Sequence, residues 1–279
     1  KQSKNPMIRT HLGPMWIPIL AVGLTITGAL AGAEPIEIHL AYLGDTASTA
    51  YIGAKQGLRE ANLQGQFLGQ TYTLEATTLH ALVAGSDPKP AAVLAALDKA
   101  QLSALSSALP DTPIFNLTAT DDSLRATCNT NLFHVIPSRR MKADAVSQWM
   151  QKHKDANVSA QAWHRDFKKY AARELNNRFR KASGTPMDDD AWAGWAAVKM
   201  TSDTVAREGR TNPEQLRTYF KEKLRFDGQK GVELSFRNTG QLRQPLLIVE
   251  DDKLVGEAPV RGVVDTTDLD SLGLKNCPK

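Results

Sequence analysis

The feature that most constrains the fold is the alternation of short apolar segments with amphipathic ones in the first half of the chain. Residues 36–42 alternate apolar and polar side chains, which predicts a strand that Gly44 and Asp45 end. A helix with one apolar face is predicted from Ser48 or Thr49 to Gly65. Residues 70–78 are rich in β-forming side chains. This order of strand, helix and strand indicates a parallel sheet with crossover helices.

The same alternation continues further along the chain. The Ala- and Leu-rich residues 88–100 predict a helix, and residues 101–109 form a further short helical run. Residues 112–117 and 132–136 are short apolar runs, typical of buried strands.

The second half is predicted to be helical first and then to form strands. Helices are expected over 163–183, 188–207 and from Asn212 to about residue 224, where Asn212 caps the helix and proline occupies its first turn. Residues 232–236 and 246–249 flank a turn at 238–240. Two or three antiparallel strands are therefore expected to close the chain.

The first 33 residues have the pattern of a secretory signal. Lys1, Lys4 and Arg9 precede the apolar residues 17–30, and small residues follow at 31–33. We expect cleavage after Ala33 and a periplasmic location, with a retained membrane anchor as the alternative. Because the leader holds three basic residues and no acidic one, its removal lowers the net charge from +4 to +1. The remaining basic residues are interleaved with acidic ones, which argues against nucleic acid as a partner.

Two cysteines, Cys128 and Cys277, are present in the chain. An oxidising compartment permits one disulfide between them. Two free thiols are the alternative, because spacing alone does not prove pairing.

No catalytic motif stands out in the sequence. The six histidines are scattered, and no metal-binding histidine pair, nucleophile elbow, Walker loop or dinucleotide-binding glycine motif is present. Residues 188–190 are three consecutive aspartates, which suggest either a cation site or, more simply, an acidic helix start. We therefore expect no enzyme activity, no cofactor and no metal.

Several segments resemble the type I periplasmic binding proteins, the leucine/isoleucine/valine-binding protein and its relatives. The segments that carry this resemblance are 53–62, 66–75 and 87–93. Residues 162–165, 175–181, 240–245 and 266–274 resemble one branch of the family more narrowly. That branch is the ABC-transporter substrate-binding proteins encoded with pyrroloquinoline-quinone-dependent alcohol dehydrogenase systems.

The resemblance implies two Rossmann-like lobes that hold a small molecule between them. Carried over to this chain, the loop 117–120 would meet the ligand through its backbone N–H groups and through the hydroxyls of Thr118 and Thr120. The implied ligand-binding residues are Asp45, Thr46, Thr118, Ala119, Thr120 and Trp192. An ordinary capped turn at residues 120–122 and a core position for Trp192 are the alternatives.

The chain is short for two complete lobes. Between residues 100 and 109 the family would have a strand and a ligand-contacting serine loop, whereas this chain has one short helical run. Between residues 154 and 161 the family would have several βαβ units of the second lobe, for which this chain has too few residues. We therefore expect an α/β fold like that of the type I periplasmic binding proteins, with the first lobe mostly present and the second reduced to a remnant. The expected divisions are a signal peptide (1–33), the first lobe (34–137), a crossover helix with second-lobe remnant (138–159), helices returning to the first lobe (160–224), and remnant antiparallel strands with the C-terminal tail (225–279).

Two functions are consistent with this pattern. The first is a periplasmic substrate-binding protein of an ABC-transporter-type system, linked by resemblance to alcohol oxidation that depends on pyrroloquinoline quinone. Its ligand would be pyrroloquinoline quinone, an alcohol-derived compound or an amino acid, and its partner a membrane permease. The second is a one-lobed accessory protein that interacts with a periplasmic quinoprotein or cytochrome.

Overall fold

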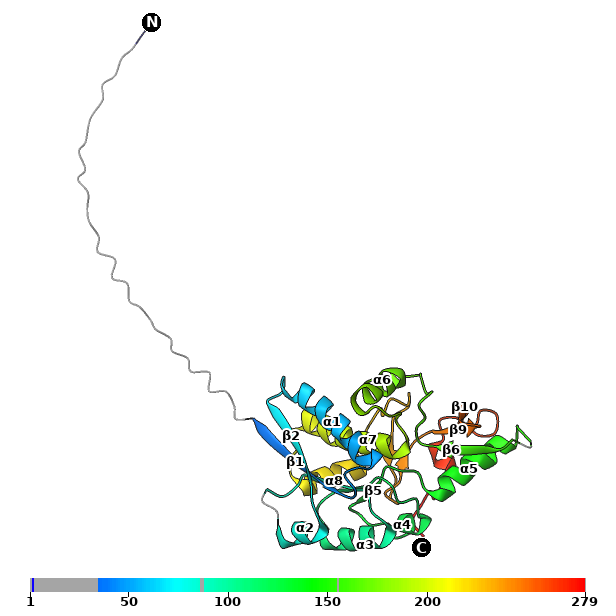
Figure 1. Ribbon diagram of the computed structural model, residues 1–279, viewed down its shortest axis with the longest axis horizontal. Helices are drawn as coiled ribbons and strands as arrows, with labels where there is room; N and C mark the ends of the chain where they lie inside the picture. The colour runs from blue at the N-terminus through cyan, green and yellow to red at the C-terminus, as the bar shows by residue number, and fades with distance from the viewer. Residues whose placement is uncertain (1, 3–34, 86–87, 155, 279) are drawn as a thin grey trace, which may run out of the picture. The chain divides into compact units, whose positions relative to one another are not determined.

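The computed structural model describes Gln2 and residues 35–85, 88–154 and 156–278, and residues 34–279 form one compact unit. The centre of this unit is a five-stranded parallel sheet with the order β2-β1-β3-β4-β5 (Figure 1). Its strands are β1 (Ile36–Leu43), β2 (Gln70–Ala76), β3 (Ala92–Ala95), β4 (Ile114–Asn116) and β5 (Leu132–His134). The expected α/β fold with a parallel sheet is confirmed.

Helices cover both faces of this sheet (Figure 1). Along β1 the side chains of Ile38, Leu40 and Tyr42 enter one apolar core, whereas Ala41 and Leu43 enter the other. This is the two-residue period of a strand that is buried on both faces. The first core is shared with α1 (Thr49–Gly65), α6 (Ala172–Ser183), α7 (Asp189–Glu208) and α8 (Pro213–Glu222); the second is shared with α2 (Leu79–Gly85), α3 (Lys99–Ala108) and α4 (Asp122–Ala126).

A smaller antiparallel sheet has the strand order β10-β9-β6. Helix α5 packs on it, and the two form a third apolar cluster around Met141, Leu246 and Ile248. The elements of this part are α5 (Arg139–Met150), β6 (Val158–Gln161), β9 (Leu246–Glu250) and β10 (Lys253–Ala258), and the hairpin β7 (Ser235–Phe236) and β8 (Leu242–Arg243) precedes β9.

Helices α1 and α7 touch backbone to backbone. A Cβ atom on Gly53 would lie 1.9 Å from the carbonyl oxygen of Ala191, and one on Gly194 would lie 2.0 Å from that of Ala50. Only glycine permits this approach, so the two glycines set the distance between the helices. The contact packs α7, from the second half of the chain, against α1 of the first βα unit, β1-α1.

Several predicted elements are confirmed and two are wrong. Strands β1, β2, β4, β5 and β9 and helices α1, α7 and α8 lie where they were expected. The predicted helix over 88–100 is wrong, because residues 92–95 form strand β3 in the middle of the sheet. The strand that the resemblance implies within 100–109 is therefore present, but earlier in the chain. The helix expected from residue 163 begins only at Ala172, after the unpredicted strand β6.

The predicted leader, residues 1–33, lies outside the described residues apart from Gln2. Among the helices that the structure describes, none is long and apolar enough to span a membrane.

A disulfide joins Cys128, which follows α4, to Cys277 near the end of the chain. The two cysteines are 149 residues apart in sequence, so the bond closes a loop that contains β5, the whole antiparallel sheet and the helices α5 to α8. Closing a long loop restricts the unfolded chain strongly.

We predict that the double variant Cys128→Ser, Cys277→Ser lowers the free energy of unfolding by about 2–5 kcal/mol. Urea unfolding with and without reductant measures this. Reductant is expected to bring the parent protein down to the stability of the variant and to leave the variant unchanged. Mass spectrometry that finds both parent thiols alkylated without reductant would contradict the prediction.

Candidate functional site

The candidate site lies at the carboxyl edge of the parallel sheet. Leu43 of β1 pairs with Ala95 of β3, Ala95 with Asn116 of β4, and Asn116 with His134 of β5, so these strands end side by side. The strand order reverses at β1 and β3, and ligands of open α/β sheets bind outside the carboxyl ends at such a switch point. We call the loops that follow β1, β3 and β4, residues 44–46, 96–98 and 117–120, the rim.

The loop after β1 is a fixed turn. The Asp45 carboxylate accepts a hydrogen bond from the Ala47 amide at 2.8 Å, and the Asp45 carbonyl accepts one from the Ser48 hydroxyl at 2.7 Å. Ser48 also caps α1. Asp45 thus holds the turn with its side chain, while Thr46 next to it is exposed.

The loop after β4 is held by a buried asparagine. Asn116 Oδ1 accepts hydrogen bonds from the amides of Thr118 (3.2 Å) and Ala119 (2.9 Å), and its Nδ2 donates to the Ala119 carbonyl at 2.8 Å. Two of the amides that were expected to meet a ligand are therefore engaged inside the chain. The Thr120 amide donates no hydrogen bond within the described part of the chain. Among the three amides of residues 118–120, it is the one without a partner in the described chain.

Trp192 does not lie on the rim. Its side chain is completely buried, its Nε1 donates to the Gly228 carbonyl at 3.2 Å, and its ring stacks on Trp163 at 5.9 Å between centroids. The buried ammonium of Lys230 lies 4.2 Å from the centre of the ring. Trp192 thus has the core position that was the alternative to a ligand contact.

The acidic start of α7 lies next to the loop after β1. Asp188 caps the helix by accepting from the Ala191 amide at 2.8 Å. Asp189 pairs with Lys142 of α5 at 2.8 Å and accepts from the Trp163 amide at 2.9 Å. Capping and pairing account for these two carboxylates without a bound cation. The described residues include no cluster of three or more metal-ligating side chains.

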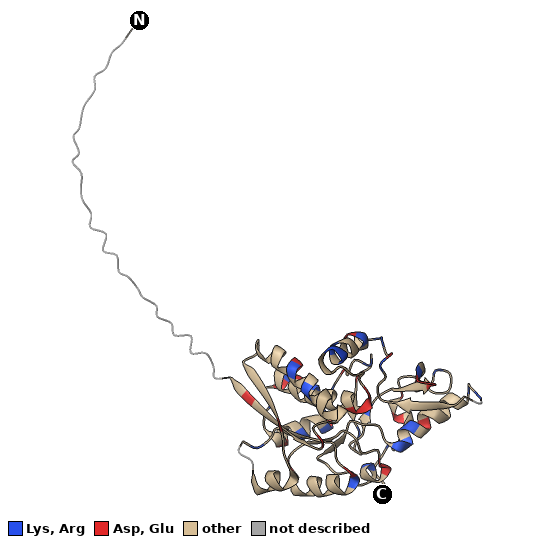
Figure 2. Ribbon diagram, in the orientation of Figure 1, with Lys and Arg blue, Asp and Glu red and all other residues tan. Residues whose placement is uncertain are grey.

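Asp190 differs from its two neighbours because, among the described residues, its carboxylate accepts no hydrogen bond and forms no ion pair. Burial, followed by the charges of Asp188 and Asp189, raises the pKa of Asp190 to about 6. Burial also raises the pKa of Tyr42, and the charges of Asp45 and Asp190 add to that shift. The carboxylates of Asp45 and Asp190 therefore both act on the Tyr42 hydroxyl, and this end of the rim is acidic. In the view of Figure 2, acidic and basic residues are otherwise mixed along the helices.

Sequence reasoning missed three parts of this site. The loop 96–98 was hidden by the predicted helix, although Asp98 and Gln101 form a capping box that marks a helix start. The polar Asn116 at the end of an apolar strand was a usable signal. The position of Asp190 beside Tyr42 had no sequence signal, because it depends on the packing of α7 against α1.

The rim is open. The structure has surface cavities of about 320–570 Å³ elsewhere, for example one beside β1, β2 and α2 that is lined by His39, Thr73 and Glu75. None of these five cavities includes the rim residues Asp45, Thr46, Thr118 or Thr120.

No protein-family model matches the chain, and no curated protein matches its sequence. Solved structures match its fold. A branched-chain amino acid ABC transporter periplasmic ligand-binding protein from Burkholderia xenovorans has a TM-score of 0.67 at 12% identity, over 79% of this chain and 95% of that one. A branched-chain amino acid transporter substrate-binding protein from Streptococcus pneumoniae, in complex with isoleucine, has a TM-score of 0.64 at 10% identity, over 80% and 98% of the two chains.

The chain has the fold of the type I periplasmic binding proteins. A third structure of this fold, the leucine-, isoleucine-, valine-, threonine- and alanine-binding protein from Brucella ovis in its closed conformation, matches with a TM-score of 0.65 at 11% identity, over 78% of this chain and 90% of that one. Identities this low establish the fold and leave the ligand open. The ligand of this periplasmic-binding-protein fold must therefore be argued from the rim.

We predict opposite effects for two neighbouring aspartates in the first turn of α7. Because burial raises the pKa of Asp190 from 3.8 to about 6, the folded state favours the protonated carboxyl, and stability is lost as the pH rises through this range. Asp190→Asn removes that loss. The difference in the free energy of unfolding between the variant and the parent, measured in urea, should therefore favour the variant more at pH 7.5 than at pH 4.5.

Asp189→Asn is the matched control. It breaks the ion pair with Lys142, so it is expected to be less stable than the parent at pH 7.5. An Asp190→Asn variant whose stability relative to the parent does not change with pH would show that Asp190 carries no such penalty.

Proposed function

We propose that the chain is a periplasmic substrate-binding protein of an ABC-transporter-type system, which binds a small polar organic molecule at the rim and does not transform it. The observation that carries this proposal is the switch point between β1 and β3, where three loops meet at the carboxyl edge of a parallel sheet. The solved structures that share the fold are substrate-binding proteins by name. Asp45, Thr46, Thr118, Ala119 and Thr120 would form one wall of the site.

The charges at the rim favour an amino-acid-like ligand. The charges of Asp45 and Asp190 both raise the pKa of Tyr42, and these carboxylates would attract an ammonium group. The amide and the hydroxyl of Thr120 would serve a carboxylate or hydroxyl oxygen. The same acidic residues would repel a polyanion such as pyrroloquinoline quinone, which the resemblance to its branch of the family keeps as a second candidate. The Streptococcus pneumoniae structure contains isoleucine, so isoleucine is a reasonable first probe.

Affinity is expected to be modest. A good pocket buries about 70–90% of its ligand's surface, and an open rim buries less. Each tenfold loss in affinity is about 1.4 kcal/mol, so the loss of two or three good contacts changes tight binding into weak binding. A permease or a second copy of the chain would then have to supply an opposing wall.

A one-lobed accessory protein is the second candidate. It is favoured by the engagement of the Thr118 and Ala119 amides with Asn116, which leaves the rim few free donors. Its partner would be a periplasmic quinoprotein or cytochrome.

We predict that the purified protein binds L-isoleucine or L-leucine with a dissociation constant no tighter than about 1 μM, and pyrroloquinoline quinone more weakly. Thr120→Ala should weaken amino-acid binding, because it removes a hydroxyl at the rim. Isothermal calorimetry measures both effects.

Thr130→Ala is the matched control, because Thr130 is exposed and lies outside the rim, and it should leave affinity unchanged. Sub-micromolar binding by a monomer would contradict the open rim, and equal binding by Thr120→Ala would remove Thr120 from the site. If none of the three compounds binds, the accessory role is favoured.

A further inference from the structure

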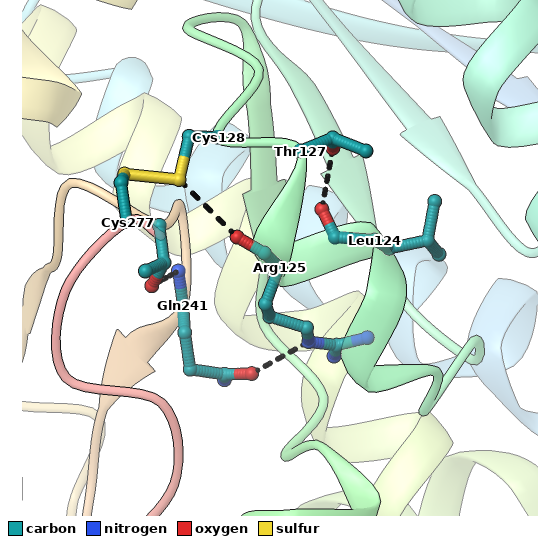
Figure 3. The surroundings of a disulfide bond; sticks show 7 residues. Leu124, Arg125, Thr127, Cys128, Gln241 and Cys277 are labelled. Carbon is teal, nitrogen blue, oxygen red and sulfur yellow. Dashed lines mark hydrogen bonds between the residues drawn. A yellow bond between two sulfur atoms is a disulfide. The ribbon is translucent and has the colours of Figure 1, made fainter. Parts of the chain in front are cut away.

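A single arginine connects four parts of the chain beneath the rim. Arg125 of α4 is 1% exposed. Its Nη1 donates to the carbonyls of Ala119 (2.7 Å) and Asp121 (2.9 Å), its Nη2 to that of Ile136 (2.9 Å), and its Nε to Gln241 Oε1 (2.9 Å). Figure 3 shows the guanidinium reaching Gln241, close to the disulfide.

The surroundings of Arg125 are themselves fixed. Gln241 Nε2 donates to the carbonyls of His134 and Ile136, each at 3.1 Å, which ties β8 to the end of β5. The Sγ atom of Cys128 lies 3.4 Å from the Arg125 carbonyl oxygen, so the disulfide anchors the chain directly after α4 (Figure 3). The guanidinium therefore acts on the loop after β4 from a rigid base.

All four acceptors of Arg125 are neutral, and in the described chain no carboxylate forms an ion pair with it. Burying a charge without a paired carboxylate is costly. Burial lowers the pKa of Arg125 to about 9, an effect that the charges of Asp122 and Asp121 oppose, so it remains charged at neutral pH. If the turn were only structural, a neutral side chain could hold it with a smaller desolvation penalty. The buried charge therefore suggests an additional role for Arg125.

The consequence of this charge appears at one peptide group. The Ala119 carbonyl receives hydrogen bonds from both Arg125 Nη1 and Asn116 Nδ2. In a trans peptide the carbonyl and the following N–H point in opposite directions, so the Thr120 N–H points away from the guanidinium. The Thr120 carbonyl is also fixed, because it accepts from the Arg139 amide at 2.9 Å. The peptide groups before and after the Thr120 Cα are both fixed by hydrogen bonds, so the Thr120 N–H has one orientation.

We propose that Arg125 is a positioning residue of the binding site: it holds the Ala119–Thr120 peptide so that the Thr120 N–H is presented to an oxygen acceptor of the ligand. This inference rests on the proposed function and names a part of its mechanism. The positive charge behind the carbonyl also polarises the peptide, which makes its N–H a stronger donor. The ligand group that suits such a donor is a carboxylate oxygen.

The test combines NMR of the Thr120 amide with calorimetry, using L-isoleucine as the probe and the full protein. In the parent, the Thr120 amide signal should shift when L-isoleucine is added. Arg125→Lys keeps the charge but loses the planar fork. It should therefore move the Thr120 amide signal in the free protein and weaken binding by about tenfold or more.

The matched control is Arg237→Lys. Arg237 is also buried; its side chain pairs with Asp270 at 2.7 Å and donates to the carbonyls of Leu269 (2.6 Å) and Leu274 (3.2 Å) in the C-terminal tail, and it forms no hydrogen bond with the loop after β4 within the described chain. This variant should lose stability without changing the Thr120 signal or the affinity. Equal weakening of binding by both variants, or parent-like affinity and a parent-like Thr120 signal in Arg125→Lys, would overturn the proposal.

The two hypotheses fail in different ways. If the parent binds neither amino acid nor pyrroloquinoline quinone, the proposed function fails, and Arg125 is judged by the free-state Thr120 signal alone: an unchanged signal in Arg125→Lys overturns its role. If Arg125→Lys does not fold, the proposal is tested on the Thr120 amide of the parent protein alone. A Thr120 amide that is protected from solvent exchange in the free protein, or unmoved at saturating L-isoleucine, overturns the proposal.

Discussion

The backbone contact between α1 and α7 determines where the rest of the structure can lie. Gly53 and Gly194 let the two helices approach so closely that any larger side chain would collide with a carbonyl of the facing helix. The contact returns the chain to the first βα unit after the antiparallel sheet has begun. It also fixes the position of the acidic first turn of α7, in which the charge of Asp190 raises the pKa of Tyr42. Helix packing therefore sets both the architecture and the charge of the candidate site.

The sequence predicted four of the five strands of the parallel sheet: β1 by its alternation, β2 by its β-forming residues, and β4 and β5 as short apolar runs. Strand β3 could not be found in this way. Its four residues are all apolar and all buried, since helices cover both faces of the sheet, and an alanine-rich run without alternation is equally typical of a helix. Misassigning this strand also hid the loop 96–98. The strand β6 was missed because its pairing with β9 joins residues about 90 positions apart.

The candidate site was predictable in place but not in detail. The resemblance implied Thr46 and Thr120 as ligand-binding residues, and the structure places both in loops that follow parallel strands at their carboxyl ends. Which amides remain free depends on the orientation of Asn116, and that is set by its partner His134, 18 residues away in sequence. Arg125 gave no signal, because an arginine in a short polar segment is usually exposed. Its burial depends on Gln241, which is 116 residues away in sequence.

An open rim and a rigid loop have opposing effects on binding. The open rim loses contact area, which weakens any complex. A loop that Asn116 and Arg125 already hold in place need not be ordered by the ligand, so binding costs less conformational entropy. If the proposed function holds, preorganisation of a single donor determines which ligand group is bound first, and the Thr120 N–H would select an oxygen. An opposing wall, whichever part of the chain or partner supplies it, would then determine how long the ligand stays bound.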